Sequence, residues 1–281
     1  MSLKIQNMTG QERIMEEKVK IKDILNCIEA VAPLYWQEDY DNAGLIIGNR
    51  DSDCTGVLIC LDVFADTVND ALQKNCNLII SHHPFIYKAF KQLRYGSDIE
   101  KILRMAVKND IAIYAAHTNM DNALRGVSHI LAEKLGLQNI SPLDNSRYPA
   151  DTGYMGGGAI GELQECIKAE DYLIEVKKKL NLPVLRCIGN TQKEIKRVGV
   201  CGGSGSFLIR NAIDRNCDMF LTADLKYHDF LSYENEIILA DIGHFESEIF
   251  IKQRFFDIIS KKMCNFAPLY ISEELNRIKF L

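Results

Sequence analysis

Short apolar runs that alternate with helical patterns are the feature of this 281-residue sequence that most constrains its fold. In the first half, helical periodicity at residues 65–74 and 99–108 lies among four strand-like runs, at 45–47, 57–61, 78–80 and 111–115. An amphipathic helical pattern over 17–32 precedes them and ends at Pro33. Strands that alternate with helices predict an α/β fold with a largely parallel sheet.

The stretch 139–161 is rich in turn formers and indicates a change of organisation. A second α/β region is expected after it, followed by a C-terminal amphipathic helix at 249–262 and a strand at 266–271. The elements expected in this second region are a helix at 166–180, strands at 184–188 and 197–201, a helix at 207–216, and strands at 219–221 and 237–240. The length is consistent with two domains of modest size.

Composition excludes several classes of protein. The net charge of −5 and the pI near 5.7 give no general attraction to nucleic acid, so a nucleic-acid partner is not expected. No run approaches the ~18–20 apolar residues of a membrane span, and we expect a cytoplasmic protein with no membrane association. The nine cysteines are scattered and form no CxxC motif, which predicts reduced and mostly buried thiols.

Four of the six histidines lie in three strings that each follow an apolar strand: NLIISHHP, AIYAAHTNMD and IILADIGHFESE. In open α/β sheets, ligands bind at the carboxyl ends of the strands, where side chains point into a shared crevice. A histidine at a strand end is ordinarily a surface or core residue, so no single one of these would indicate a metal. Their joint occurrence predicts a common site.

The spacing within these strings predicts two metal ions. Adjacent His82 and His83 would point in different directions along an extended backbone, so each suits its own ion. The other two strings each hold a histidine and a carboxylate four residues apart, a spacing that a helical turn places on one face. Imidazole and carboxylate ligands without thiolate suit zinc, manganese, iron, cobalt or nickel. The predicted ligands are His82, His83, His117, Asp121, His244 and Glu248. About three ligands per ion leave coordination positions open for water or substrate.

Asp224 and His228, in FLTADLKYHD, follow another predicted strand at the same spacing. They are candidate catalytic residues that could bind substrate, transfer protons or orient a metal ligand. A helix N-cap at Thr222 or Asp224 followed by a surface histidine explains the string equally well.

Two further strings have a functional and a structural interpretation. In CGGSGS, backbone amides at a helix N-terminus could bind an anion through Gly203, Ser204, Gly205 and Ser206, but a tight turn capped by Ser204 or Ser206 competes equally. In EDYDNAGLIIG, an Asx turn is the ordinary explanation for Asp39, Asp41 and Asn42, with a site role as the weaker alternative. The glycines of GGGAIGEL, at 156–163, favour a close strand or a bulge over a ligand site.

The strings SHHP, AAHTNMD, CGGSGS, LTADLKYH and DIGHFESE, in this order between Asp41 and Glu248, resemble the Nif-three-like dinuclear metal-centre family. Its members are often called GTP cyclohydrolase I type 2 homologues. The tryptophan that often precedes the family's Asp-Asn-x-Gly string is Tyr40 here. The resemblance implies the same six metal ligands, and two α/β domains with mostly parallel sheets facing one another across a dimetal cleft. The first domain would comprise 1–124 and 249–281, the second 125–248. The resemblance also implies a ring-shaped homohexamer.

Three functions follow as hypotheses. The first is a metal-dependent hydrolase that uses metal-activated water on a small-molecule or nucleotide substrate, with GTP ring opening as one candidate reaction. The second is a non-enzymatic metal-binding or scaffold protein, a ring that stores, delivers or senses metal. The third, a DNA-associated regulator, has the least support because the chain is acidic.

Overall fold

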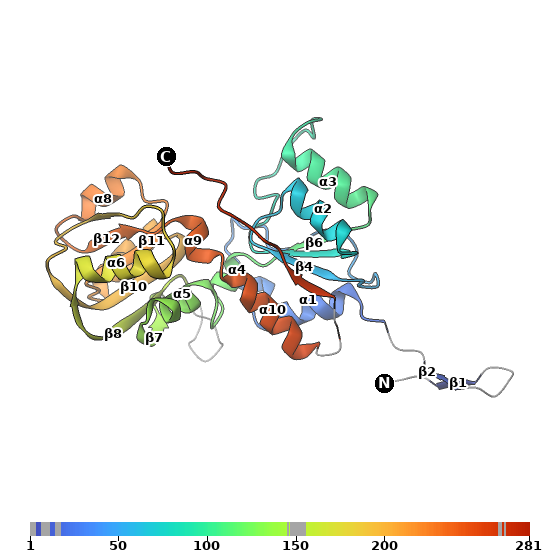
Figure 1. The fold of residues 1–281 in the computed structure, drawn as a ribbon, viewed down its shortest axis with the longest axis horizontal. Coiled ribbons are helices and arrows are strands. Elements are labelled where there is room, and N and C mark those ends of the chain that lie inside the picture. The colour runs from blue at the N-terminus through green and yellow to red at the C-terminus, as the bar shows by residue number, and fades with distance from the viewer. Residues whose placement is uncertain are drawn as a thin grey trace.

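Each lobe of the chain is built on its own β-sheet, and the lobes meet at a junction formed by short helices (Figure 1). The computed structural model describes residues 4–6, 12–14, 18–144, 146, 156–263, 266 and 268–281. The predicted α/β class is confirmed.

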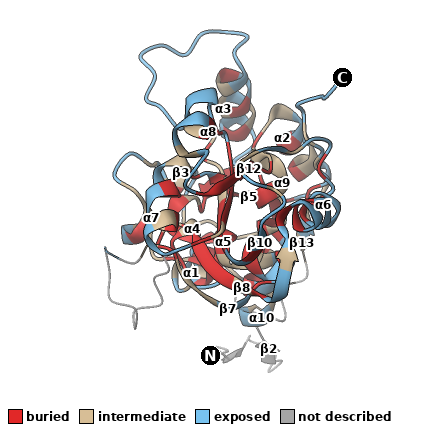
Figure 2. Ribbon diagram, turned by 90° about the vertical axis from the view of Figure 1, so that its left-hand side faces the viewer, coloured by how far each residue is buried: buried red, intermediate tan, exposed pale blue. Residues whose placement is uncertain are grey.

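The first sheet has the order β13-β4-β5-β6-β3. The first four strands in this order are parallel to one another, and β3 pairs antiparallel with β6 at the edge of the sheet. The strands are β13 (Leu269–Ile271), β4 (Val57–Cys60), β5 (Leu78–Ser81), β6 (Ala112–Ala115) and β3 (Gly44–Ile47). All residues of β4, β5 and β6 are buried, as expected for parallel strands covered on both faces. Figure 2 shows this burial concentrated on the central strands.

Helices cover both faces of this sheet, as the alternation of the sequence predicts. On one face, α2 (Ala65–Gln73) and α3 (Asp98–Lys108) share a core with Leu58 and Ile79. On the other, α1 (Ile21–Glu29) and α10 (Ile251–Lys262) share a core with the neighbouring residues of the same strands, such as Ile59 and Ile80. Successive residues therefore point to opposite faces, each into its own core.

The second sheet is mixed rather than mostly parallel. Its order is β7-β8-β10-β11-β12-β9, and only β10, β11 and β12 pair in parallel. The strands are β7 (Gln138–Pro142), β8 (Ala159–Lys168), β10 (Glu194–Ser204), β11 (Met219–Ala223), β12 (Ile238–Asp241) and β9 (Arg186–Ile188). Long β8 extends into the start of the expected helix at 166–180, so α6 begins only at Ala169 and ends at Lys179.

A glycine explains how β8 pairs with β7. A Cβ on Gly161 would lie 2.8 Å from the Cβ of Leu137 and 2.9 Å from the carbonyl oxygen of Gln138. The glycine string at 156–163 therefore serves a close strand, as expected. Helices α5 (Val127–Leu135) and α6 cover one face of this sheet, and α7 (Ile209–Asp214) and α8 (Tyr227–Tyr233) cover the other.

The junction contains α4 (Thr118–Asp121), α9 (His244–Glu248) and α10. Although α10 follows the second sheet in sequence, Ile251, Phe255 and Ile259 are buried in the core of the first lobe. The exact domain division stays a prediction. From β13, residues 272–281 extend toward α9 (Figure 1). The remaining elements are η1 (Leu34–Trp36), η3 (Ser206–Leu208) and an unexpected hairpin of β1 (Lys4–Gln6) and β2 (Glu12–Ile14).

The cysteines that the structure describes are all free, and most are buried; Cys166 and Cys187 are exposed, and Cys264 lies outside the described residues. Over the described parts of the chain, every helix is too short or too polar to cross a bilayer.

Candidate metal centre

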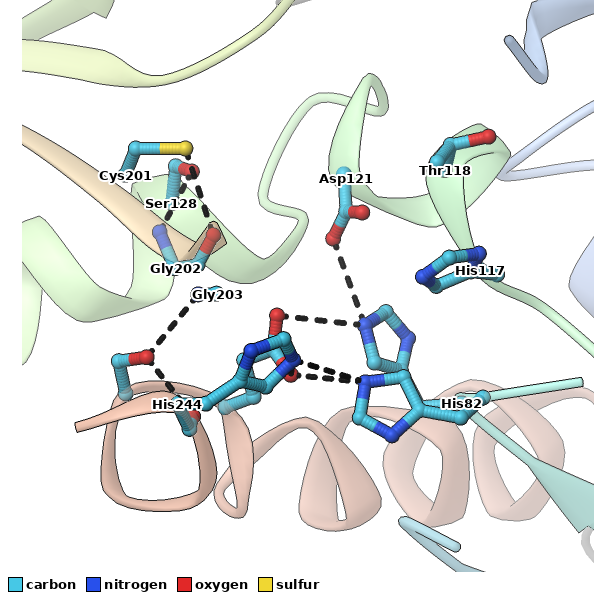
Figure 3. Close-up of polar contacts among 12 residues, drawn as sticks. His82, His117, Thr118, Asp121, Ser128, Cys201, Gly202, Gly203 and His244 are labelled. Carbon is cyan, nitrogen blue, oxygen red and sulfur yellow. Dashed lines mark hydrogen bonds and ion pairs between the residues drawn. The ribbon is translucent and has the colours of Figure 1, made fainter. Parts of the chain in front are cut away.

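The structure brings the six predicted ligands together at the junction of the lobes. His82 and His83 follow β5, and His117 follows the adjacent parallel strand β6, so all three leave the sheet at one edge. His117 is the N-cap of α4, which ends at Asp121. From the second lobe, His244 and Glu248 begin and end α9. Figure 3 shows Asp121, His82 and His244 directed toward a common centre.

Their donor atoms form three groups, two of which share Glu248. In the inner group (His82, Asp121 and Glu248), His82 Nε2 lies 3.5 Å from Asp121 Oδ1 and 3.8 Å from Glu248 Oε1. In the outer group (His83, His244 and Glu248), Glu248 Oε2 lies 2.9 Å from His83 Nε2 and 3.2 Å from His244 Nε2. The donor atoms within each group lie within 4.8 Å of one another, so each group could hold a metal ion. The donor atoms of His82, His83 and His117 form a third such group.

Each of these four histidines is held through Nδ1 by a partner outside the cluster. The partners are the carbonyl oxygen of Ala116 for His82 at 2.8 Å, Asp62 for His83 at 2.9 Å, Asp41 for His117 at 2.7 Å and Asp224 for His244 at 2.7 Å. An Nδ1–H that donates to a carbonyl or carboxylate fixes the ring orientation and leaves Nε2 as the metal-binding atom. These contacts are the supporting shell typical of histidine metal ligands.

Two buried polar atoms of the inner group lack a hydrogen-bond partner within the described chain: His82 Nε2 and Asp121 Oδ1. A buried polar atom without a partner costs about 1–3 kcal/mol. A cation between these atoms would satisfy both, so the residues fit a metal.

Burial and neighbouring carboxylates shift the pKa values of four residues of the cluster. Burial raises the pKa of Asp121 well above its usual range, and nearby Glu248 adds to the effect. Burial lowers the pKa of His82. Burial also opposes a charge on His83 and His244, but hydrogen bonds to carboxylates outweigh it and raise their pKa to about 10 and about 11. Because a bound cation takes the place of these protons, metal binding should release protons.

A cleft of about 1080 Å³ opens onto the cluster from one side, lined by both lobes. His117, Asp121 and Glu248 line it together with Tyr87 from the first lobe and Phe207 from the second. A second cavity of about 940 Å³ reaches His83 and His244 from the side of the C-terminal residues. The cleft is large enough for a small-molecule ligand.

The two candidate catalytic residues lie in different surroundings. Asp224 reaches the cluster, where its carboxylate orients His244, one of the roles predicted for it. Its backbone has φ +57°, a left-handed conformation that asparagine and aspartate tolerate better than most residues. His228 is exposed on α8, where its ring contacts that of Tyr227. A catalytic role for His228 stays a prediction.

The glycine string beside the site has a structural explanation. A Cβ on Gly203, which has φ +61°, would lie 2.2 Å from Glu248 Oε1, so only glycine lets the chain pass this ligand. The Gly203 amide donates to Ser247 Oγ at 3.0 Å, and the Gly202 amide donates to Ser128 Oγ at 3.3 Å. Serine hydroxyls therefore already accept hydrogen bonds from the amide of Gly203, in the proposed anion site, and from that of Gly202 beside it. Anion binding by Gly203, Ser204, Gly205 and Ser206 stays a prediction.

Asp62 and Asp41 are the functional neighbours that sequence reasoning missed or underrated. Asp62 follows β4 at the same edge as the histidines, and the strand-end rule that found His82 would also have found it. Asp41 accepts from the amide of the adjacent Asn42 at 2.7 Å, not from the amide two residues on as in an Asx turn, and it also holds His117 and Thr118. These hydrogen bonds outweigh burial and lower the pKa of Asp41 to about 2.

Comparisons with known proteins identify relatives of the whole chain. The sequence profile of the family described as Duf34/NIF3 (NGG1p interacting factor 3) matches residues 19–274. A Clostridium acetobutylicum protein named "GTP cyclohydrolase 1 type 2 homolog" is 32% identical over 232 residues, covering 82% of this chain and 85% of that protein. A protein of the same name from Clostridium perfringens is 28% identical and covers 91% of this chain and 97% of its own length.

Solved structures share the fold. A Bacillus cereus protein related to NIF3 has a TM-score of 0.88 at 24% identity and covers 95% of this chain and 100% of its own. A Staphylococcus aureus protein has a TM-score of 0.85 at 28% identity, covering 94% of this chain and 100% of its own.

Proposed function

Because this chain belongs to the Duf34/NIF3 family, we propose that it is a metal-dependent hydrolase with a dinuclear centre. The resemblance carried by its motifs is confirmed by the family profile and by the named relatives. The centre would be held by His82, His83, His117, Asp121, His244 and Glu248.

The shared carboxylate is the observation that carries this proposal. Glu248 is 3% exposed and turns Oε1 toward His82 and Oε2 toward His83 and His244. A carboxylate with one oxygen on each of two donor groups is suited to bridging two ions. Burial would raise the pKa of Glu248, but the surrounding histidines hold it well below its usual range, so the bridge is anionic.

The donor set suits hydrolysis because it does not saturate two ions. Six protein ligands for two ions would leave coordination positions open, and the cleft borders His117, Asp121 and Glu248. Divalent ions bound there would supply Lewis acidity, acidifying water and polarising an electrophilic carbon or phosphorus. The protein's own part is orientation: Asp62, Asp41 and Asp224 hold three of the histidine rings.

The substrate class is proposed from the cleft and from the names of the relatives. The cleft is formed by both lobes and has room for a nucleotide-sized molecule. Curated relatives are named GTP cyclohydrolase 1 type 2 homolog, which makes GTP the first nucleotide to test. We include in the proposal a homohexameric assembly, to be checked by light scattering.

The test combines metal content with turnover. Protein purified without chelators or nickel resin would be assayed against GTP, other nucleotides and phosphoesters, alongside metal-stripped protein and folded His82→Ala. We expect turnover by the wild type, none by the metal-stripped protein or by His82→Ala, and recovery when metal is added back to the stripped wild type. Bound metal without turnover on any substrate would favour the alternative of a non-enzymatic metal-binding or scaffold protein. Absence of bound metal, with no uptake of zinc, manganese or iron, would overturn both.

A further inference from the structure

The C-terminal tail, residues 272–281, contacts the loop at Asp62, which orients His83, and the helix α9, which carries His244 and Glu248. It follows β13 and forms one wall of the second cavity, opposite His83 and His244. Figure 1 shows it leaving the first lobe and ending near the second. The tail therefore lies where it can influence the metal ligands that border that cavity.

Glu274 is the residue that fixes the tail to the first sheet. Its Oε2 accepts the Leu61 amide at 2.8 Å, and its Oε1 accepts the Asp62 amide at 3.1 Å. Lys252 on α10 pairs with Glu274 Oε2 at 2.9 Å and donates to the Ser272 carbonyl oxygen at 2.9 Å. The two charged side chains are only 9% and 10% exposed, so removing either charge would leave the other buried and uncompensated.

This ion pair connects directly to the metal ligands. Asp62, whose amide Glu274 binds, holds His83 Nδ1 at 2.9 Å through its own carboxylate. Lys252 lies four residues beyond Glu248 in the chain segment that continues from α9 into α10. Glu274 and Lys252 thus connect the loop at Asp62, which orients His83, to the α9–α10 segment, which carries Glu248.

A second contact joins the tail to α9 itself. Asn276 Nδ2 donates to Glu246 Oε1 at 2.8 Å, and Glu246 lies between His244 and Glu248. Arg277 anchors the tail more peripherally, stacked 3.6 Å from the centroid of the Phe64 ring and 3.2 Å from Asp66 Oδ2. Among the described residues, the tail makes no hydrogen bond or ion pair with His82, Ala116 or Asp121 of the inner side.

From these contacts we propose that Glu274 is a positioning residue for one of the two metal positions, the outer group, and that the tail sets the occupancy of that position. The inference rests on the proposed dinuclear centre. Loosening Glu274 frees the backbone at Asp62, so His83 loses its fixed orientation. His82 keeps its orientation because its partner is the Ala116 carbonyl oxygen at the end of β6.

The first variant is Glu274→Gln. Its amide can accept only one of the two backbone N–H groups, and it leaves Lys252 unpaired. Loss of a residue that orients a metal ligand typically lowers metal affinity about 10–100-fold. Glu274 acts through such a residue, Asp62, so we expect a loss of at most this size, and for one ion only. The metal-free protein would be titrated with Zn²⁺ by calorimetry and with Co²⁺ by visible absorption, and the bound ions counted by native mass spectrometry.

Two further variants keep the test decisive. Arg277→Ala removes a tail contact with the side chains of Phe64 and Asp66 but leaves Glu274 bound to the Asp62 amide, and should bind both ions as the wild type does. If Glu274→Gln does not fold, the double variant Lys252→Met with Glu274→Gln removes both buried charges together. The double variant should keep one Co²⁺ absorption band, and this band should match the one that appears first when the wild type is titrated. A general loss of stability would weaken both bands instead.

The outcomes separate this inference from the proposed function. Two ions in the wild type and selective weakening of one in the Glu274 variants support it. Equal weakening of both ions, or none, overturns it while leaving the dinuclear centre intact. A wild type that binds no metal overturns the proposed function, and this inference with it.

Discussion

The inner and outer groups differ in how the fold holds them. In the inner group, His82 is fully buried and its ring is fixed by a backbone carbonyl from the neighbouring strand of the same sheet. In the outer group, His244 is 38% exposed, comes from the other lobe, and is fixed by Asp224, itself 52% exposed. The inner group thus depends mainly on residues of the first lobe, whereas the outer group combines residues from the two lobes.

This difference indicates that the two proposed metal positions should differ in metal affinity. Two of the three inner side chains, those of His82 and Glu248, have little freedom because they are buried within the first sheet and α9. The outer group also depends on exposed contacts, which solvent screens and which contribute less. We therefore expect the inner ion to bind more tightly than the outer ion.

The largest expected effect comes from removing what the groups share. Glu248→Gln takes the bridging charge from both, so we expect both ions to bind at least about 100-fold more weakly, a loss of about 2.7 kcal/mol each. Calorimetric titration of the metal-free protein measures this. Glu234→Gln, at an exposed position after α8, is the control. An ion retained at wild-type affinity in Glu248→Gln would show that Glu248 does not serve both groups.

The second prediction tests whether the groups act separately. Asp121→Asn removes the carboxylate that belongs only to the inner group, and Asp224→Asn weakens the partner of a histidine that belongs only to the outer group. We expect each variant to lose affinity for a different ion, and the loss in Asp224→Asn to be about 10–100-fold. The Co²⁺ absorption bands of the two variants distinguish the ions. Identical spectra from both would contradict two independent positions.

The first lobe shows why much of this site can be predicted from the sequence. His82, His83 and His117 each follow a hydrophobic run directly, so their place at the edge of a parallel sheet follows from strand order alone. The spacing of His117 to Asp121 and of His244 to Glu248 matches the short helices α4 and α9. Local patterns thus identified the residues of the cluster, because each of them lies next to an element that local patterns define.

Long-range contacts account for what the sequence could not show. Glu274 lies more than 200 residues from Leu61 and Asp62, whose amides it binds, and no local pattern connects them. The expected helix at 166–180 overlaps the last three residues of β8, because no local pattern marks where the chain passes from this strand into α6. The sequence leaves an anion site and a tight turn as equal interpretations at Gly203, because the residue that it approaches, Glu248, is 45 positions away in sequence.

A third prediction concerns the close approach at that glycine. Gly203→Ala would force a methyl group against Glu248 Oε1 and impose a left-handed backbone on alanine. We expect a loss of about 1–2 kcal/mol in the free energy of unfolding, and weaker binding of both ions because Glu248 must move. Thermal melts and metal titration measure the two effects. Gly96→Ala, a positive-φ glycine with open space around it, separates backbone strain from contact with Glu248. Unchanged metal binding in Gly203→Ala would exclude the contact.

The smallest expected effect lies away from the site, in the second lobe. Asp218 accepts hydrogen bonds from Lys193 Nζ and from the amides of Lys196 and Arg197. Burial opposes its charge, but these donors outweigh burial and lower its pKa below 3.8. Since the folded pKa is lowered, the stabilisation is present above the unfolded pKa and is lost as pH falls through the folded value.

Asp218→Asn should therefore lower the free energy of unfolding by about 1 kcal/mol at neutral pH, and the difference from wild type should shrink below about pH 4. Denaturant unfolding across pH measures it, with metal binding at neutral pH unchanged. A difference that grows on acidification would contradict the sign of the pKa shift.

Anomalous X-ray diffraction at a metal absorption edge, from crystals grown with Zn²⁺, tests the two-position account most directly. The account predicts two peaks for each chain, one among His82, Asp121 and Glu248 and the other among His83, His244 and Glu248, with the inner peak at least as strong. A single peak shared by all six residues, or none at this junction, would contradict it.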